Sequence, residues 1–210
     1  MTTTFHLMRQ FVVRPIAALV GRLDVTGRAN LPASGGYVVA CNHVGWVDPL
    51  WLGFAVGDDR VHYMAKRELF SPAPLGVLMR QCHVFPVDRQ RPGPDTIKTA
   101  LRLLGAGQIV LVFPGGTRTA EAASFKRGAA TIAAMAGVPI VPAQYSGPAT
   151  IKPAHLLKRP PVRIVFGAPI LPDQVLGVGD NTRARVQAVT DRLEQSVAAL
   201  SGVYDDQRIG

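Results

Sequence analysis

Short apolar runs rich in Val and Ile alternate along this chain with segments of helical periodicity. Several runs are apolar at every position, which is typical of strands covered on both faces. The alternation predicts an α/β fold with a mixed, largely parallel sheet flanked by helices. The predicted strands are Tyr37–Cys41, Val61–Ala65, Val84–Val87, Ile109–Phe113, Pro139–Tyr145 and Val162–Phe166. The predicted helices are Pro49–Val56, Pro74–Gln81, Thr96–Leu104, Arg127–Ala136 and Thr182–Leu200.

The N-terminal segment has apolar side chains at helical spacing with arginines among them. Arg9, Arg14 and Arg22 interrupt these positions, whereas a membrane-spanning helix needs about 18 consecutive apolar residues. The pattern predicts an amphipathic helix, kinked or divided at Pro15, that lies on a membrane surface or packs on the core. We expect residues 1–24 to be a membrane-associating helix and residues 25–210 to be one domain.

The chain is basic: 23 Lys and Arg against 14 Asp and Glu give a net charge of +9. This charge favours partners that carry phosphate or carboxylate. Aromatic residues make up only 7% and do not interleave with a basic strand pattern, so we expect no nucleic-acid partner. Cys41 and Cys82 belong to no CxxC or Cys/His cluster, so we expect neither a metal site nor a redox pair.

A first candidate site follows the strand that ends at Cys41. His43 and Asp48 lie five positions apart around a turn that contains Gly45. If the turn folds back, Asp48 accepts a hydrogen bond from one ring nitrogen of His43 and leaves the other nitrogen as a base. The alternative is an ordinary loop histidine, with Asp48 capping the next helix.

Two further candidate segments also follow predicted strands. Gly115 and Gly116 let the backbone approach a ligand, and Arg118 supplies donors that match a phosphate. Lys66 and Arg89 each follow another strand, so these basic groups are expected on one rim of the sheet. Taken singly, a Gly-Gly turn or a surface arginine needs no ligand; the shared position is what indicates a phosphate pocket.

Four blocks stand in order along the chain. They are Asn42-His43 to Asp48; Ala65–Phe70 with Pro74–Gly76 and Phe85–Arg89; Phe113–Thr119; and Gly137–Pro142. The first is similar to a His-x4-Asp motif, and together the blocks resemble those of the lysophosphatidic acid acyltransferase family, the 1-acyl-glycerol-3-phosphate acyltransferases.

This resemblance implies that residues 25–210 are an acyltransferase domain. In it His43 is the general base that removes a proton from an acceptor hydroxyl, and Asp48 orients His43. The family pattern also implies that Arg89 and Arg118 bind the acceptor phosphate. The other residues expected at the substrate site are Asn42, Lys66, Gly115, Gly116 and Thr117.

The resemblance further implies an acyl donor, acyl-CoA or acyl carrier protein, a lysophospholipid acceptor, no separate cofactor, and a peripheral position on the cytoplasmic face of a membrane. One position departs from the pattern: Gly115 stands where the family normally has Glu. This departure bears on the acceptor rather than on His43 and Asp48. It leaves open another lysolipid, an amino-acid lipid, or lipid binding without turnover.

Overall fold

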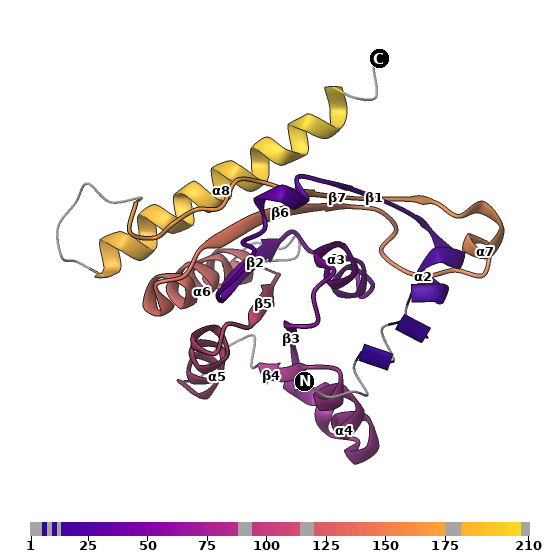
Figure 1. Ribbon diagram of the computed structural model, residues 1–210, viewed down its shortest axis with the longest axis horizontal. Helices are drawn as coiled ribbons and strands as arrows, with labels where there is room; N and C mark the ends of the chain where they lie inside the picture. The colour runs from indigo at the N-terminus through magenta and orange to yellow at the C-terminus, as the bar shows by residue number, and fades with distance from the viewer. Residues whose placement is uncertain are drawn as a thin grey trace.

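The computed structural model describes residues 6–7, 10–11, 14–87, 94–113, 120–174 and 182–206. Over these residues the chain forms one seven-stranded sheet with helices on both faces, which confirms the expected α/β fold (Figure 1). The strands, in chain order, are β1 (Arg22–Thr26), β2 (Tyr37–Cys41), β3 (Val61–Lys66), β4 (Val84–Val87), β5 (Ile109–Val112), β6 (Ile140–Ser146) and β7 (Pro161–Phe166).

The strand order in the sheet is β1-β7-β6-β2-β5-β3-β4. The pairing is antiparallel between β6 and β7 and parallel between all other neighbours. The five strands from β2 to β6 therefore point the same way, and their carboxyl ends meet at one edge of the sheet. In an α/β sheet this edge is where ligands usually bind.

The helices cover the sheet in two layers. The α-helices are α2 (Arg14–Val20), α3 (Asp48–Val56), α4 (Ala73–Gln81), α5 (Pro94–Gly105), α6 (Ala120–Ala136), α7 (His155–Lys158) and α8 (Thr182–Asp206). The described residues also include the short 3-10 helices η2 (Arg28–Asn30) and η3 (Arg67–Phe70). Helix α3 packs on one face of the sheet, while α5, α6 and α8 pack on the other.

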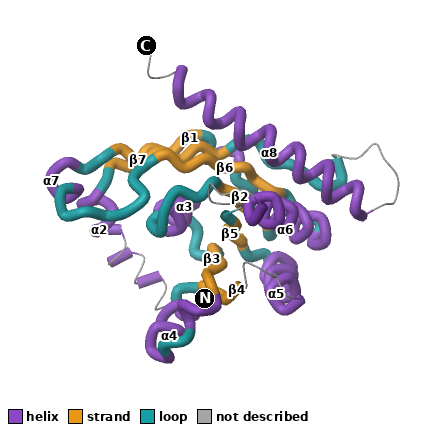
Figure 2. Tube along the Cα trace, turned by 180° about the vertical axis from the view of Figure 1, so that it is seen from behind, coloured by secondary structure: helices purple, strands orange, loops and turns teal. Residues whose placement is uncertain are grey.

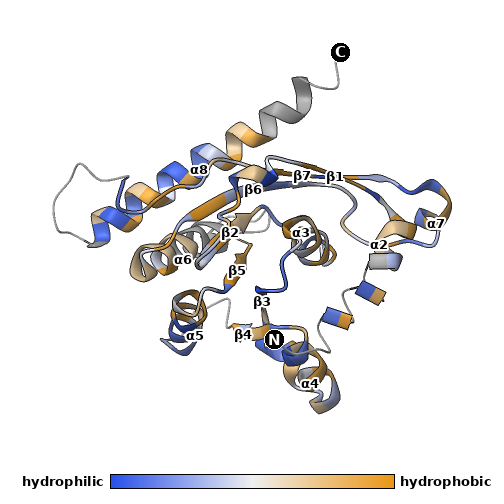
Figure 3. Ribbon diagram, viewed as in Figure 1, coloured by the Kyte–Doolittle hydropathy of each residue, from blue (hydrophilic) through white to orange (hydrophobic). Residues whose placement is uncertain are grey.

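Strand β2 shows why its sequence is apolar throughout. Tyr37, Val39 and Cys41 belong to the core beneath α3, whereas Val38 and Ala40 belong to the core beneath α5, α6 and α8. All five residues are buried, so an alternating polar pattern would leave polar groups in one core or the other. Figure 3 shows the hydrophobic colouring on the central strands and the mixed colouring of α8, which has an exposed face.

The N-terminal segment differs from its expected boundary. Helix α2 ends at Val20, and residues Arg22–Thr26, assigned by the sequence in part to the N-terminal helix, form the edge strand β1. Ala17 and Val20 pack on the core, whereas Leu19 and Phe11 are exposed. The described part of the segment thus contacts the core on one side and leaves apolar side chains uncovered on the other. Among the described residues, no helix is both long and apolar enough to cross a membrane.

Two helices extend well beyond their predicted ends, by six residues or more. Helix α6 begins at Ala120, seven residues before the predicted Arg127, because the Ala-rich stretch before Gly128 has high helix propensity. Helix α8 runs to Asp206 through Gly202, where the sequence predicted its end. A glycine costs only about 1 kcal/mol inside a helix, so it weakens the helix without ending it.

Two histidines stack at the start of β3 and β4. The rings of His62 and His83 lie 4.6 Å apart between centroids and are nearly parallel, at 8°. The Nδ1 atoms of His62 and His83 lie 3.0 Å and 3.3 Å from the carbonyl oxygens of Arg60 and Val61. Burial lowers the pKa of both rings, and for His62 the neighbouring His83 and Arg102 lower it further.

The stacked pair predicts a pH-dependent stability. Because the folded-state pKa values are lowered, the unfolded chain binds more protons below about pH 6.5, the ordinary histidine value. The pair's contribution is therefore complete above that pH and is lost as the pH falls. We expect the Tm of the wild-type chain to fall more steeply between pH 7 and pH 5 than that of His62→Gln, measured by circular dichroism. Equal slopes would show that the pair does not titrate in this range.

Candidate active site

The loop after β2 carries the histidine and the carboxylate that the sequence singled out. The Nδ1 atom of His43 lies 3.0 Å from Oδ2 of Asp48. Asp48 is 0% exposed at the first turn of α3, whereas the His43 side chain is 21% exposed. The predicted hydrogen bond between the two side chains is thus present in the structure, at the carboxyl end of the central strand β2.

Asp48 also closes the loop through the backbone. The same Oδ2 atom accepts hydrogen bonds from the N–H groups of Val44, at 2.5 Å, and Gly45, at 2.9 Å. Three N–H groups therefore surround one buried carboxylate oxygen, and the N-terminus of α3 adds a favourable dipole. These contacts stabilise the charged carboxylate out of water and hold the His43 backbone in place.

This arrangement determines which nitrogen of His43 is free. An ionised carboxylate only accepts hydrogen bonds, so this contact favours the tautomer of the neutral ring that has its proton on Nδ1 and a lone pair on Nε2. The ring packs beside Phe113, with centroids 5.3 Å apart. A partly exposed ring with an unprotonated Nε2 is able to accept a proton from a hydroxyl group, which is the chemistry that a general base needs.

Asn42 fastens the site to the neighbouring strand. Its Nδ2 donates to the carbonyl of Tyr145 at 3.0 Å, and its Oδ1 accepts from the Tyr145 N–H at 2.6 Å. This pair of bonds joins the end of β2 to the end of β6, directly before His43. The structure therefore shows a bracing contact for Asn42; the substrate contact expected for it stays a prediction.

Gly45 makes a contact that the sequence did not indicate. A Cβ atom at this position would lie 1.9 Å from the carbonyl oxygen of Ala149, in the connection between β6 and β7. Only glycine allows the two backbones to approach so closely. The residues are distant in sequence, and a lone glycine in a loop gives no signal of its partner.

Two ionisable side chains beside the carboxylate are held in their neutral forms. Burial raises the pKa of the Cys41 thiol well above its usual range, and the charge of Asp48 raises it further. The same two causes raise the pKa of the Tyr145 phenol, whose hydroxyl donates to the carbonyl of Pro148. Cys41 is fully buried and remains a thiol, so it packs the core and does not act as a nucleophile.

The predicted basic residues are located only in part. Lys66 is exposed at the carboxyl end of β3, at the edge that also carries His43. Arg89, Gly115, Gly116, Thr117 and Arg118 lie outside the described residues. Phe113, the last described residue before Gly115 and Gly116, contacts the ring of His43.

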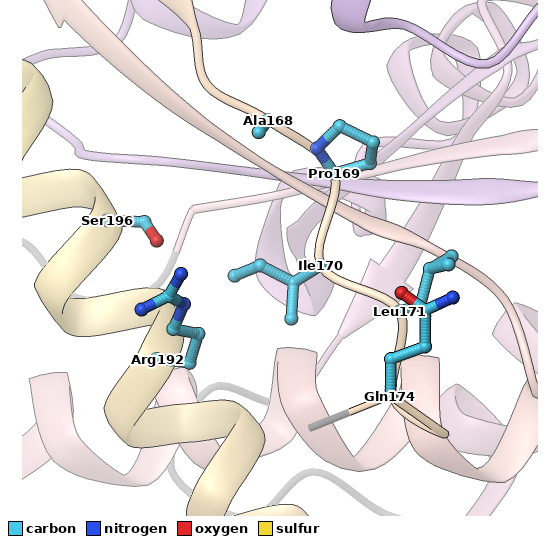
Figure 4. A pocket seen from close by; sticks show the side chains of 7 residues that line it. All are labelled: Ala168, Pro169, Ile170, Leu171, Gln174, Arg192 and Ser196. Atoms are coloured by element: carbon cyan, nitrogen blue, oxygen red, sulfur yellow. The ribbon is translucent and has the colours of Figure 1, made fainter. Parts of the chain in front are cut away.

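Other parts of the described chain offer less to a reaction. No group of three His, Cys, Asp or Glu side chains within it is placed to hold a metal ion. A hollow of about 450 Å³ lies between residues 168–174 and α8, where Arg192 and Ser196 face Ile170 (Figure 4). Ile170 pairs with Ile140 at the start of β6, so this hollow is at the opposite end of that strand from His43.

In the comparison with protein families, the model of the acyltransferase family matches residues 22–146, from β1 to the end of β6. The 1-acyl-sn-glycerol-3-phosphate acyltransferase of Bacillus subtilis is 42% identical over 193 residues, which are 92% of this chain and 95% of that protein. A protein of the same name from Streptococcus pneumoniae is 34% identical over 198 residues, covering 93% of this chain and 72% of that protein.

A solved structure has a similar fold. The 1-acyl-sn-glycerophosphate (LPA) acyltransferase of Thermotoga maritima superposes with a TM-score of 0.62 over 96% of this chain and 84% of that chain. The two sequences are 22% identical, so this likeness supports the fold alone.

The Gly45 contact predicts that alanine destabilises the chain at position 45 but not at a glycine with open space around it. In Gly45→Ala the new methyl group must displace the Ala149 backbone, and we expect the free energy of unfolding to fall by about 1–3 kcal/mol in urea denaturation. Gly128→Ala is the matched control, because nothing lies within 4 Å of a Cβ at this position in α6. That variant should be about 0.5–1 kcal/mol more stable than the wild-type chain. Equal stability of the two variants would contradict the close approach.

Proposed function

Because this chain belongs to the acyltransferase family, we propose that it is a 1-acyl-sn-glycerol-3-phosphate acyltransferase. It moves a fatty-acyl group from acyl-CoA or acyl carrier protein to the free hydroxyl of the acceptor, giving phosphatidic acid. The names of the Bacillus and Streptococcus relatives support this acceptor, and the chain spans almost the whole Bacillus protein. The observation that carries the proposal is the His43–Asp48 pair at the carboxyl end of β2.

In the proposed reaction, Nε2 of His43 takes the proton of the acceptor hydroxyl as its oxygen attacks the thioester carbonyl. A tetrahedral intermediate forms and then collapses. The carbon–sulfur bond breaks, and the protonated His43 returns its proton to the leaving thiolate. Asp48 keeps Nδ1 protonated and stabilises the imidazolium between the two transfers. The nucleophile belongs to the substrate, so the protein needs no serine or cysteine nucleophile.

The acceptor's phosphate is assigned to basic groups that follow the parallel strands. Arg89 and Arg118 bind the phosphate oxygens, with Lys66 and the backbone of Gly116 and Thr117 nearby. Lys66 supports this assignment, because it is exposed at the carboxyl end of β3, at the same edge of the sheet as the His43 loop. Gly115 stands where the family normally has Glu, and this departure bears on which acceptor the site takes.

We place the enzyme at a membrane surface as a peripheral protein, on the cytoplasmic face. The N-terminal segment supports this position, because Leu7, Phe11 and Leu19 are exposed apolar side chains. A net charge of +9 favours an anionic surface. The acceptor is itself a lipid, so a docked enzyme can take it from the bilayer.

The central test of the mechanism is replacement of the base. With acyl-CoA and 1-acyl-glycerol-3-phosphate, thiol release by His43→Gln should fall by roughly 10²–10⁴-fold in kcat, the usual contribution of a general base. His62→Gln, assayed at pH 8, is the matched control because it removes a histidine at the other end of the sheet and should keep wild-type kcat. Wild-type turnover by His43→Gln would contradict the mechanism.

The acceptor assignment is tested separately with Arg118→Ala. Loss of a phosphate contact made equally in ground and transition states should raise the KM for 1-acyl-glycerol-3-phosphate with little change in kcat. The assay is repeated with other lysolipids and with amino-acid lipids, the acceptor classes that Gly115 leaves open. Thiol release with one of these alone would make Gly115 a specificity position, and no release with any donor would favour lipid binding without turnover.

A further inference from the structure

The connection between β6 and β7 carries the most exposed large apolar side chain in the described part of the chain. Leu157 in α7 is 91% exposed, and the adjacent Leu156 is 56% exposed. Ile151, which precedes α7 in the same connection, packs against the core instead. We refer to residues 152–159 as the α7 tip.

The α7 tip is attached at the edge of the sheet that carries His43. Strand β6 runs parallel to β2, so the connection that leaves β6 starts beside the loop that leaves β2. The close approach of Gly45 to the Ala149 carbonyl joins the two loops directly. Figures 1 and 2 show α7 beside α2, which is the described end of the N-terminal segment. The tip is therefore connected to the active-site loop through Ala149.

The tip is also positively charged. Lys152, Lys158 and Arg159 are exposed in it, and the sequence has no Asp or Glu from residue 147 to residue 160. Helix α2, which lies beside α7, has no acidic side chain either. Arg159 has a φ of 41°, in the left-handed region that usually takes glycine, so a cation occupies a position where the backbone favours another residue.

We propose that the α7 tip docks on an anionic bilayer, with Leu156 and Leu157 in the interfacial region and the three cations against lipid phosphates. Protruding leucines flanked by basic side chains suit a lipid surface, because apolar burial and attraction to anionic lipids both strengthen binding there. The proposal rests on the lipid acceptor of the proposed function, and it adds a second contact, separate from the N-terminal segment. With two contacts, the edge that carries His43 is held facing the bilayer.

The docking experiment measures vesicle binding without turnover. The full-length chain is sedimented with vesicles of phosphatidylcholine containing phosphatidylglycerol, and with phosphatidylcholine alone. We expect the double variant Leu156→Glu/Leu157→Glu to bind the anionic vesicles roughly tenfold or more weakly than the wild-type chain. Met135→Glu is the matched control: Met135 is 54% exposed near the end of α6, which leads to the opposite edge of the sheet. It should bind as the wild-type chain does.

The charge and the leucines are tested apart. Lys158→Gln/Arg159→Gly keeps the leucines, and glycine suits the backbone at position 159. We expect this variant to lose most of the preference for phosphatidylglycerol vesicles. Leu157→Trp in a Trp46→Phe background leaves one other indole, the buried Trp51. The emission of this variant should shift to shorter wavelength on anionic vesicles. Unchanged Tm values establish that the variants are folded.

The outcomes separate this proposal from the proposed function. Weaker vesicle binding by the double variant, with wild-type thiol release on a short-chain acceptor dissolved in water, supports the α7 tip as a docking element. If the double variant binds vesicles more weakly but the wild-type chain itself shows no thiol release, the result would support docking and contradict the enzyme activity. Wild-type vesicle binding by the double variant would overturn the docking proposal. The docking proposal would also be overturned if the double variant lost only thiol release from acyl carrier protein and kept its vesicle binding. That result would show that the tip binds a protein donor.

Discussion

The buried carboxylate of Asp48 is the interaction on which the site depends. One of its oxygens accepts from the His43 ring and from two backbone N–H groups, while the residue itself begins α3. A buried charge is stable only when it is compensated in this way. The three contacts to Oδ2 therefore close the loop, begin the helix and orient the histidine together. The chemistry of the site and the stability of the loop have the same cause.

The sheet supplies the frame around this loop. Strand β2 lies between β6 and β5, so the His43 loop is braced on one side by Asn42 on Tyr145 and flanked on the other by Phe113. The pattern of parallel strands brings Lys66 to the same edge. In our account, the exposed Leu19 of α2 and the α7 tip then hold that edge against the bilayer. A chemical step on a lipid hydroxyl and access to that lipid are thus arranged on one side of the domain.

Much of this arrangement follows from the sequence. The ends of the six predicted strands agree with the structure to within one residue, since Val/Ile runs buried on both faces have few alternative structures. The spacing of His43 and Asp48 left a hydrogen-bonded pair and an ordinary loop histidine both open; the family resemblance favoured the pair, which the structure contains. Strand β1 was missed because Arg22–Thr26 has only two apolar positions, Leu23 and Val25, and becomes a strand only through β7. The Asn42–Tyr145 bonds join residues 103 positions apart, so no local pattern encodes them. The polar partners of a buried group depend on tertiary contacts, which periodicity does not report.

The most direct measurement of the central claim is the protonation state of the His43 ring. The five histidines of the chain can be observed by ¹⁵N-labelled side-chain NMR at pH 8, with His43 assigned by its absence in His43→Gln. The account predicts a neutral ring with the proton on Nδ1 and a lone pair on Nε2, and loss of this tautomer preference in Asp48→Asn. A wild-type ring with its proton on Nε2 would contradict the account, because the nitrogen that faces the substrate could not then act as a base.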